Sequence, residues 1–193
     1  MLVLALDSGG IPRRWIDIET AIMHHARGTV VWSLGEEVAV YRGGHNAAGI
    51  QSQISTNSII AVRGDIHKLG RVALTNRSLF ARDSNMCGYC GNVYGSSNLS
   101  RDHILAKCNG GKDVWTNVVT SCLKCNLKKG GKRLEHTNMK LLYVPYEPNH
   151  YESLILQNRN ILADQMQYLL AGVSKNSRIA NVDKYTQQEY TNH

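Results

Sequence analysis

Two pairs of cysteines with the spacing C-x2-C are the residues of this chain best suited to chemistry. Cys87 and Cys90 form the first pair, Cys122 and Cys125 form the second, and 31 residues separate the two. Each pair can present two thiolates to one ion, and four thiolates in a tetrahedron suit Zn²⁺. The spacing therefore predicts a structural zinc site, and the fifth cysteine, Cys108, is expected to be an unligated thiol.

A second group of polar residues lies between and just after these pairs. Asp102 and His103 are adjacent, Asn117 follows, and Asn126 comes directly after the last cysteine. A zinc site alone does not require them, but oxygen ligands suit a hard cation such as Mg²⁺, and an imidazole can take a proton from water. These residue types are those of a single-metal phosphodiesterase site. Adjacent strand residues point to opposite faces, so Asp102 and His103 can share a site only where a strand ends or bends.

At these residues the sequence resembles the HNH endonucleases, also called ββα-metal or His-Me finger nucleases. The similarity is to the bacterial and phage branch that carries two C-x2-C knuckles, and it covers about residues 78–133. It rests on the motifs Phe80-Ala-Arg-Asp, Cys87-x2-Cys90, Leu99-x2-Asp102-His103, Gly110-Gly111, Trp115-x-Asn117-x2-Thr120 and Cys122-x2-Cys125-Asn126-x2-Lys129. Ala106 departs from the pattern, because many relatives carry proline there.

The resemblance implies a fold in which a β-hairpin supplies the acid and the histidine and a following helix supplies the last metal ligand. His103 would be the general base that activates water, and Asp102 and Asn126 would bind a catalytic Mg²⁺ or Mn²⁺. Asn117 would orient the His103 ring. The implied enzyme is a hydrolase that cuts DNA phosphodiester bonds, leaves a 5′ phosphate and a 3′ hydroxyl, and nicks one strand per site.

Positive charge is concentrated around the same residues. Positions 63–133 hold 13 Lys/Arg and four Asp, a net charge of +9, whereas the other 9 basic and 11 acidic residues give −2. Five cations on and after the helix expected to carry Asn126 could form a solvated face, but contact with the DNA backbone is favoured. They are Lys124, Lys128, Lys129, Lys132 and Arg133.

The predicted fold class is α+β, with a ββα-metal nuclease core stapled by the four-cysteine zinc site, a small α+β N-terminal region and a C-terminal helix. The expected domains are an accessory region over 1–62, a linker over 63–77, the nuclease over 78–133, a helical extension over 134–173 and a polar tail over 174–193. Local patterns predict strands over 2–6, 29–32, 38–41 and 54–62, helices over 15–27 and 76–83, a loop over 42–53 and one amphipathic helix over 151–173.

The chain carries no apolar stretch near the roughly 20 residues that span a bilayer, and its opening apolar run is too short for a signal peptide. We therefore expect no membrane partner, and we expect the protein to lie in a reducing cytoplasm, that of a bacterium or of a phage-infected cell.

A double-strand break would need a second site. A homodimer through the 151–173 helix is one route to it.

Two other classes of protein compete with this reading. One is a non-catalytic, zinc-stabilised module that binds nucleic acid, and the other is a redox protein that uses its C-x2-C pairs.

The proposed roles predict that Cys90→Ser or Cys122→Ser loses fold and activity together. Asp102→Ala or Asn126→Ala is expected to abolish cleavage while the melting temperature stays near that of the wild type.

Overall fold

The computed structural model describes residues 1–64, 70–174 and 177–179, which form two compact units. The first unit contains 1–70 with 157–172, and the second contains 71–156 with 173 and the described residues after it. The expected linker over 63–77 falls partly, and the polar tail mostly, outside the described residues. The predicted helical extension over 134–173 is divided between the units, and the domain limits stay a prediction.

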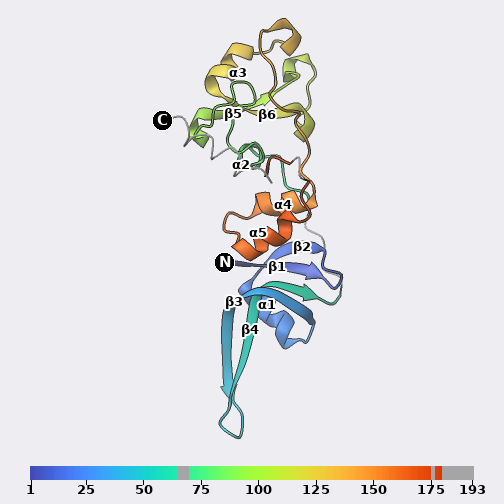
Figure 1. Ribbon diagram of the computed structural model, residues 1–193, viewed down its shortest axis with the longest axis vertical. Coiled ribbons are helices and arrows are strands. Elements are labelled where there is room, and N and C mark those ends of the chain that lie inside the picture. Colours follow the sequence, from blue (N-terminus) through green and yellow to red (C-terminus); the bar gives the residue numbers. More distant parts are fainter. Residues whose placement is uncertain (65–69, 175–176, 180–193) are drawn as a thin grey trace. The chain divides into compact units, whose positions relative to one another are not determined.

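The first unit is a four-stranded mixed sheet with the strand order β2-β1-β4-β3 (Figure 1). β1 pairs antiparallel with β2 and parallel with β4, and β3 pairs antiparallel with β4. Its strands are β1 (Leu2–Asp7), β2 (Pro12–Asp17), β3 (Val30–His45) and β4 (Gln51–Val62), and its helix α1 spans Ile18–Ala26. Side chains of β1, β2, β4 and α1 form the core, namely Val3, Ala5, Ile16, Ala21, Ile60 and Val62.

The start of α1 differs from the helix predicted over 15–27. Trp15 lies in β2, where it pairs with Leu4 of β1, and its side chain is buried. The helix begins at Ile18 because the Asp17 carboxylate accepts a hydrogen bond from the Thr20 N–H at 2.7 Å and so caps the first turn. The helical spacing of apolar residues therefore begins at Trp15, before the helix itself, in a segment that forms strand β2.

The segment predicted as two strands with a turn between them is one strand of 16 residues, β3. Gly35 takes a positive φ of +84°, and the pairing with β4 shifts register between Leu34 and Glu37. The irregularity is therefore absorbed as a bulge and does not reverse the chain. As a result, most of 42–53, predicted as a loop, forms the end of a long β-hairpin.

The single helix predicted over 151–173 is two helices, α4 (His150–Gln157) and α5 (Ala163–Leu170). The second begins where the Leu162 N–H donates to Gln165 Oε1 at 3.1 Å. Leu154 of α4 and Leu169 of α5 are both buried within the chain. A homodimer through this segment stays a prediction. Among the described residues, we find no helix with the length and apolar character needed to cross a membrane.

The second unit contains the short hairpin of β5 (Leu99–His103) and β6 (Val118–Cys122), with α2 (Asn76–Arg82) before it and α3 (Leu123–Lys129) after it. In the hairpin, Leu99 pairs with Cys122 and His103 pairs with Val118. Thr75 caps α2, because its Oγ1 accepts a hydrogen bond from the Ser78 N–H at 3.1 Å. Single 3-10 turns lie at Ser96–Asn98, Lys107–Asn109, Trp115–Asn117 and Leu134–His136.

A buried ion pair fastens α2 to this hairpin. Arg82 and Asp83 are fully buried, and Arg82 Nε lies 2.8 Å from Asp83 Oδ1. The same guanidinium donates, at 2.9 Å each, to three backbone carbonyls, those of Trp115, Val118 and Tyr146. Asp83 in turn accepts from the Thr120 N–H on β6 at 2.9 Å. Each of the two charges is thus neutralised and hydrogen-bonded, which makes their burial tolerable.

Candidate functional site

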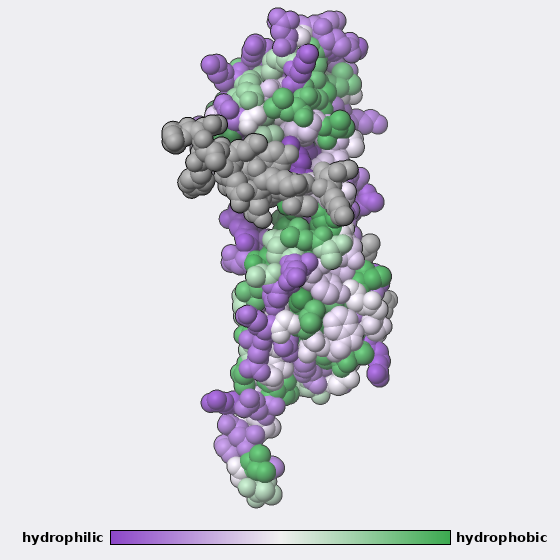
Figure 2. All heavy atoms as spheres, in the orientation of Figure 1, coloured by the Kyte–Doolittle hydropathy of each residue, from purple (hydrophilic) through white to green (hydrophobic). Residues whose placement is uncertain are grey.

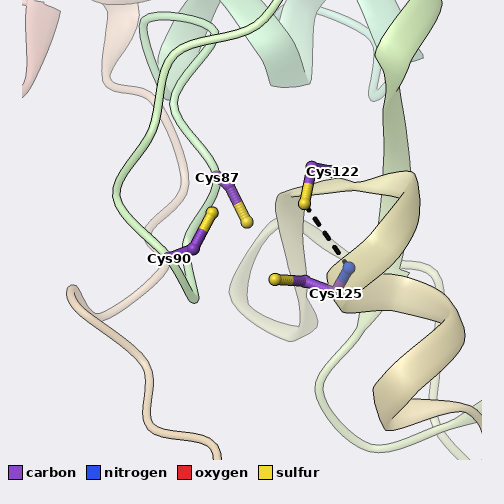
Figure 3. Close-up of side chains that lie close together, drawn as sticks. All are labelled: Cys87, Cys90, Cys122 and Cys125. Atoms are coloured by element: carbon purple, nitrogen blue, oxygen red, sulfur yellow. Dashed lines mark hydrogen bonds between the residues drawn. The ribbon is translucent and has the colours of Figure 1, made fainter.

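The four cysteines of the two C-x2-C pairs come together in space (Figure 3). Cys87 and Cys90 lie on the loop after α2, Cys122 ends β6, and Cys125 lies in the first turn of α3. Their sulfur atoms all lie within 4.8 Å of one another, and Figure 3 shows them pointing into a common space. In the described part of the chain, this is the one such cluster of three or more Cys, His, Asp or Glu side chains.

The backbone holds each cysteine pair in place. In the first knuckle, the Cys87 N–H donates to Asn92 O and the Gly91 N–H donates to Cys87 O, at 2.9 and 3.0 Å. Gly91 has a φ of +79°, a conformation that favours glycine, and the Gly88 N–H ties the knuckle to β6 through Thr120 O. In the second knuckle, the Cys125 N–H donates to Cys122 Sγ at 3.4 Å.

The thiols are electrostatically suited to a cation. Burial raises the pKa of Cys87, but backbone N–H donors from Cys122, Cys90 and Tyr89 outweigh it and lower this pKa to about 7. The pKa of Cys125 is raised by burial and then by the neighbouring sulfurs. Four thiolates this close repel one another unless a cation lies between them, so the donor set fits Zn²⁺. All five cysteines are free, and the cluster of four argues against two separate redox pairs.

His103 is the last residue of β5, at the strand end that the site requires. Its ring atom Nε2 lies 2.7 Å from Asp113 Oδ1. Arg101 holds the other oxygen of that carboxylate, with NH1 2.7 Å from Asp113 Oδ2. The hydrogen bond from Arg101, reinforced by His103, lowers the pKa of Asp113, so this acid is ionised beside the ring at neutral pH.

Asn117 fixes the loop that connects His103 to Asp113. Its amide nitrogen donates to Leu105 O at 3.1 Å and to Lys112 O at 2.8 Å, while its amide oxygen accepts from the Leu105 N–H at 3.0 Å. Its backbone carbonyl accepts from the Ile104 N–H at 2.9 Å. Asn117 therefore acts on the backbone directly after His103, with no bond to the ring itself among these contacts.

Asp102 points to the other face of β5, toward α3, and is buried. One of its oxygens accepts from the Tyr89 hydroxyl, and the other lies 3.1 Å from Lys129 Nζ. The Lys129 ammonium also donates to His103 O at 2.6 Å. The sequence predicts that Lys129 contacts DNA, but the structure buries this side chain completely and pairs it with Asp102. Lys129 lies on the inner side of α3, so phosphate cannot reach its ammonium in this conformation.

Asn126 lies on the same side of α3 as Lys129. Its amide nitrogen donates at 2.8 Å to the hydroxyl of Ser100, which shares a strand face with Asp102. The amide oxygen of Asn126 and the carboxylate of Asp102 thus belong to one helix–strand contact. Each Asp102 oxygen has an acceptor position beyond the bond it already makes, so these two residues fit a hard divalent cation as a partial ligand set.

The family comparison agrees with this geometry. Residues 87–142 match the family model described as HNH endonuclease. This segment belongs to the HNH endonuclease family. No curated protein matches the chain. The HNH segment begins at the first cysteine of the cluster and contains both knuckles, the β5–β6 hairpin and α3.

Four of the five cations predicted to contact DNA lie on the surface of the HNH segment. They are Lys124, Lys128, Lys132 and Arg133. Lys124 and Lys128 lie on the outer side of α3, and the other two follow it. Phosphate contact by these four stays a prediction.

Sequence reasoning missed two residues of the HNH site, Asp113 and Tyr89. Asp113 is half-exposed and lies four residues before Asn117, so its position within the hairpin connection is the signal that could have found it. Tyr89 lies inside the first cysteine pair, and burial together with the Asp102 hydrogen bond raises the pKa of its phenol. Its hydroxyl therefore stays protonated and serves as a donor to Asp102.

Proposed function

We propose that this protein is a metal-dependent HNH endonuclease that hydrolyses DNA phosphodiester bonds. The observation that carries the proposal is the arrangement at the end of β5. There, His103 faces the Asp113 carboxylate, and the adjacent Asp102 pairs with Lys129 of α3. Asn126 of the same helix bonds to Ser100, which lies on the same face of β5 as Asp102. Membership of residues 87–142 in the nuclease family supports the same reading.

Asp113 selects the form of His103 that can act as a base. An ionised carboxylate only accepts hydrogen bonds, so the Nε2 atom that faces it must carry the proton. The lone pair of a neutral ring is then on Nδ1, which is the atom that would take a proton from the attacking water. Because Arg101 holds Asp113, this orientation is kept while the ring gains and loses its proton.

Asp102 and Asn126 would hold the catalytic divalent ion, Mg²⁺ or Mn²⁺. When bound, this ion would supply positive charge to the scissile phosphate and to the departing 3′ oxygen. The chain's own residues keep Asp102 in place, because Tyr89 and Lys129 fix its two oxygens. The four-cysteine site would hold a separate Zn²⁺ that joins the first knuckle to the hairpin and α3.

The proposed reaction leaves a 5′ phosphate and a 3′ hydroxyl. Each site holds one general base and one predicted pair of metal ligands, so each is proposed to cut one strand. A nick is therefore the expected first product, and cutting both strands would require two catalytic events.

Cleavage of supercoiled plasmid tests the proposal. Wild-type protein with Mg²⁺ or Mn²⁺ should convert the plasmid to the nicked form, and His103→Ala should reduce the rate at least about a hundredfold. His136→Ala is the matched control, because His136 is exposed and lies outside the site. Resealing of the nicks by DNA ligase without prior phosphorylation would identify the 5′ phosphate and 3′ hydroxyl ends.

The same assay separates the enzyme from a non-catalytic binding module. If wild type and His103→Ala nick plasmid equally slowly while both bind DNA, the enzyme assignment fails and the binding module replaces it. If neither protein binds nor cuts DNA, both assignments fail.

A further inference from the structure

The outer part of the β3–β4 hairpin is an exposed two-stranded extension with no role in the proposed site. We call residues 40–55 the arm. β1 pairs with β4 at Ile59–Val62, whereas β3 and β4 remain paired with each other as far as His45 and Gln51. Every residue from 40 through 53 is exposed, and Figure 2 shows the arm as a narrow projection from the body of its unit.

The tip of the arm is held in a defined conformation. The Asn46 N–H donates to Ile50 O at 2.9 Å, and the Asn46 side chain accepts from the N–H groups of Ala48 and Ile50 at 3.0 and 2.9 Å. Gln51 and Ser52 also donate across the hairpin to Gly43 O and Gly44 O, at 3.1 Å each. A two-stranded ribbon gains little stability from its own few contacts, so an ordered, fully exposed one is better explained by a partner than by folding.

The side chains of the arm divide by face. Arg42 pairs with Gln53, and His45 pairs with Gln51. Directly paired residues share a face, and Gln51 and Gln53 are two positions apart on one strand, so all four lie on the same side. Tyr41 and Ile54, which pair with each other, lie on the opposite side. One face of the arm therefore presents a row of hydrogen-bonding side chains.

This row suits the major groove of double-stranded DNA. A two-stranded β-ribbon fits that groove, which is about 12 Å wide, and Arg and Gln are the side chains that pair with the edges of guanine and adenine. No Asp or Glu occurs between Glu37 and Asp65, so the arm carries no carboxylate to repel phosphate. Arg42 adds positive charge, and glycines at 43, 44 and 49 keep the end of the ribbon thin.

A second copy of the chain fits the arm less well. Pairing between two arms would need a regular, flat edge, but the β3–β4 register shifts within the arm, between Arg42 and His45. Such irregularities twist an edge and hinder its pairing with another strand. The polar face of the arm also lacks the continuous apolar surface that a second copy would bury.

We propose that the arm enters the major groove of DNA and sets the sequence preference of cleavage, with Arg42 and Gln53 contacting base edges. This proposal rests on the proposed DNA nuclease function. It adds that the first unit, which lies outside the HNH segment, reads the sequence that the HNH segment cuts.

Selection of binding sites from a random pool of duplex DNA tests the arm. The full chain is used with His103→Ala, so that bound DNA is not cut. The parent protein should select a defined sequence, and adding Arg42→Ala and Gln53→Ala should lower affinity for that sequence about tenfold or more, with a smaller change for unrelated DNA. Tyr41→Phe on the opposite face should leave the selected sequence unchanged.

Arg42→Lys separates base reading from charge. Lysine keeps the positive charge but lacks the planar fork of arginine, so this variant should lose sequence preference while non-specific affinity remains. Unaltered selection by the double variant would overturn the proposal, as would a parent protein that selects no sequence. A change in oligomeric state with DNA selection intact would assign the arm to a second copy.

A parallel cleavage assay on protein with an intact His103 keeps the two proposals apart. Cleavage that continues at scattered positions in the arm variant would support both. Selection that depends on the arm, in a protein that never cuts DNA, would leave the arm proposal standing and remove the nuclease.

Discussion

One carboxylate, that of Asp113, contacts the His103 ring. Asp113 bridges the ring Nε2 and the Arg101 guanidinium, at 2.7 Å to each. A carboxylate in this position orients the ring, selects its tautomer and stabilises the imidazolium that forms when the base takes a proton. Asp113 is therefore expected to be a positioning residue that raises the rate without contacting the reacting atoms.

Asp113→Asn tests this role. The amide keeps the shape of the side chain but removes the charge and offers a donor as well as an acceptor, so the ring is no longer held in one tautomer. We expect plasmid nicking to slow about ten- to a hundredfold while DNA affinity is unchanged. Glu135→Gln, an exposed carboxylate outside the site, is the control. A nicking rate equal to that of the wild type would contradict the role.

Lys129 and Lys128 are neighbours with opposite roles. Lys129 is buried against Asp102, whereas Lys128 is exposed. Lys129→Ala leaves the Asp102 carboxylate buried without its counter-charge, which should lower the free energy of unfolding by about 3 kcal/mol or more. Lys128→Ala should change it by less than about 0.5 kcal/mol. Urea unfolding measures both, and equal stabilities would show that Lys129 is not the buried partner of Asp102.

The same contact changes what Asp102→Ala can reveal. From the sequence, this variant is expected to keep a melting temperature near that of the wild type. In the structure, losing Asp102 leaves the Lys129 ammonium buried without a counter-charge, so stability and cleavage should fall together. Asn126 is half-buried and bonds to Ser100, so Asn126→Ala is the clearer test of metal binding.

At the scale of elements, the HNH segment is assembled by two fastenings. The cysteine cluster joins the first knuckle to the end of β6 and the start of α3. The Arg82–Asp83 pair joins α2 to β6 through the Val118 carbonyl and the Thr120 N–H, and it also binds the carbonyls of Trp115 and Tyr146 outside the two strands. One fastening is proposed to depend on a metal and the other does not, so they can be broken separately.

Breaking the metal fastening should unfold the segment. Cys90→Ser removes one of four proposed zinc ligands, so we expect zinc content to fall from about one per chain, with melting temperature and nicking falling alongside it. Cys108→Ser is the matched control, because Cys108 is free, exposed and outside the cluster. Elemental analysis and thermal denaturation measure the outcome. A Cys90→Ser protein with full stability would remove the structural role of the cluster.

Breaking the ion-pair fastening should be costly without affecting the zinc. Arg82→Met leaves Asp83 as an unpaired buried charge and deprives the carbonyls of Trp115, Val118 and Tyr146 of their donor. We expect a loss of about 3 kcal/mol or more in the free energy of unfolding, with zinc content retained in the folded fraction. A loss below about 1 kcal/mol would show that the pair is dispensable.

The features that could be predicted from the sequence are those that local chemistry determines. The cysteine spacing and the adjacency of Asp102 and His103 each depend on a few neighbouring residues. Apolar spacing predicts that Trp15 lies in a helix, which is wrong because its pairing with Leu4 is a strand contact that helical spacing does not reveal. Lys129 resembles its exposed neighbours until α3 is packed against β5, and only that packing shows which lysine faces Asp102.

At the scale of the whole molecule, the positive charge is concentrated in the part of the chain that contains most of the HNH segment. Positions 63–133 carry a net charge of +9 against −2 elsewhere, and the family match falls largely on the basic part. Non-specific DNA affinity should therefore come from the HNH segment. Counterion release makes such affinity fall steeply with salt, by about one unit of log–log slope for each phosphate contact.

Salt titration of DNA binding tests this division. In the full chain with His103→Ala, Lys128→Ala and Lys132→Ala together should lower the slope of log affinity against log salt by about 2, equally for any duplex sequence. Arg27→Ala, an exposed cation of the first unit, should leave the slope unchanged and serves as the control. An unchanged slope in the lysine double variant would place phosphate binding elsewhere. A change confined to one DNA sequence would mean that these lysines read bases and that sequence reading is not left to the arm.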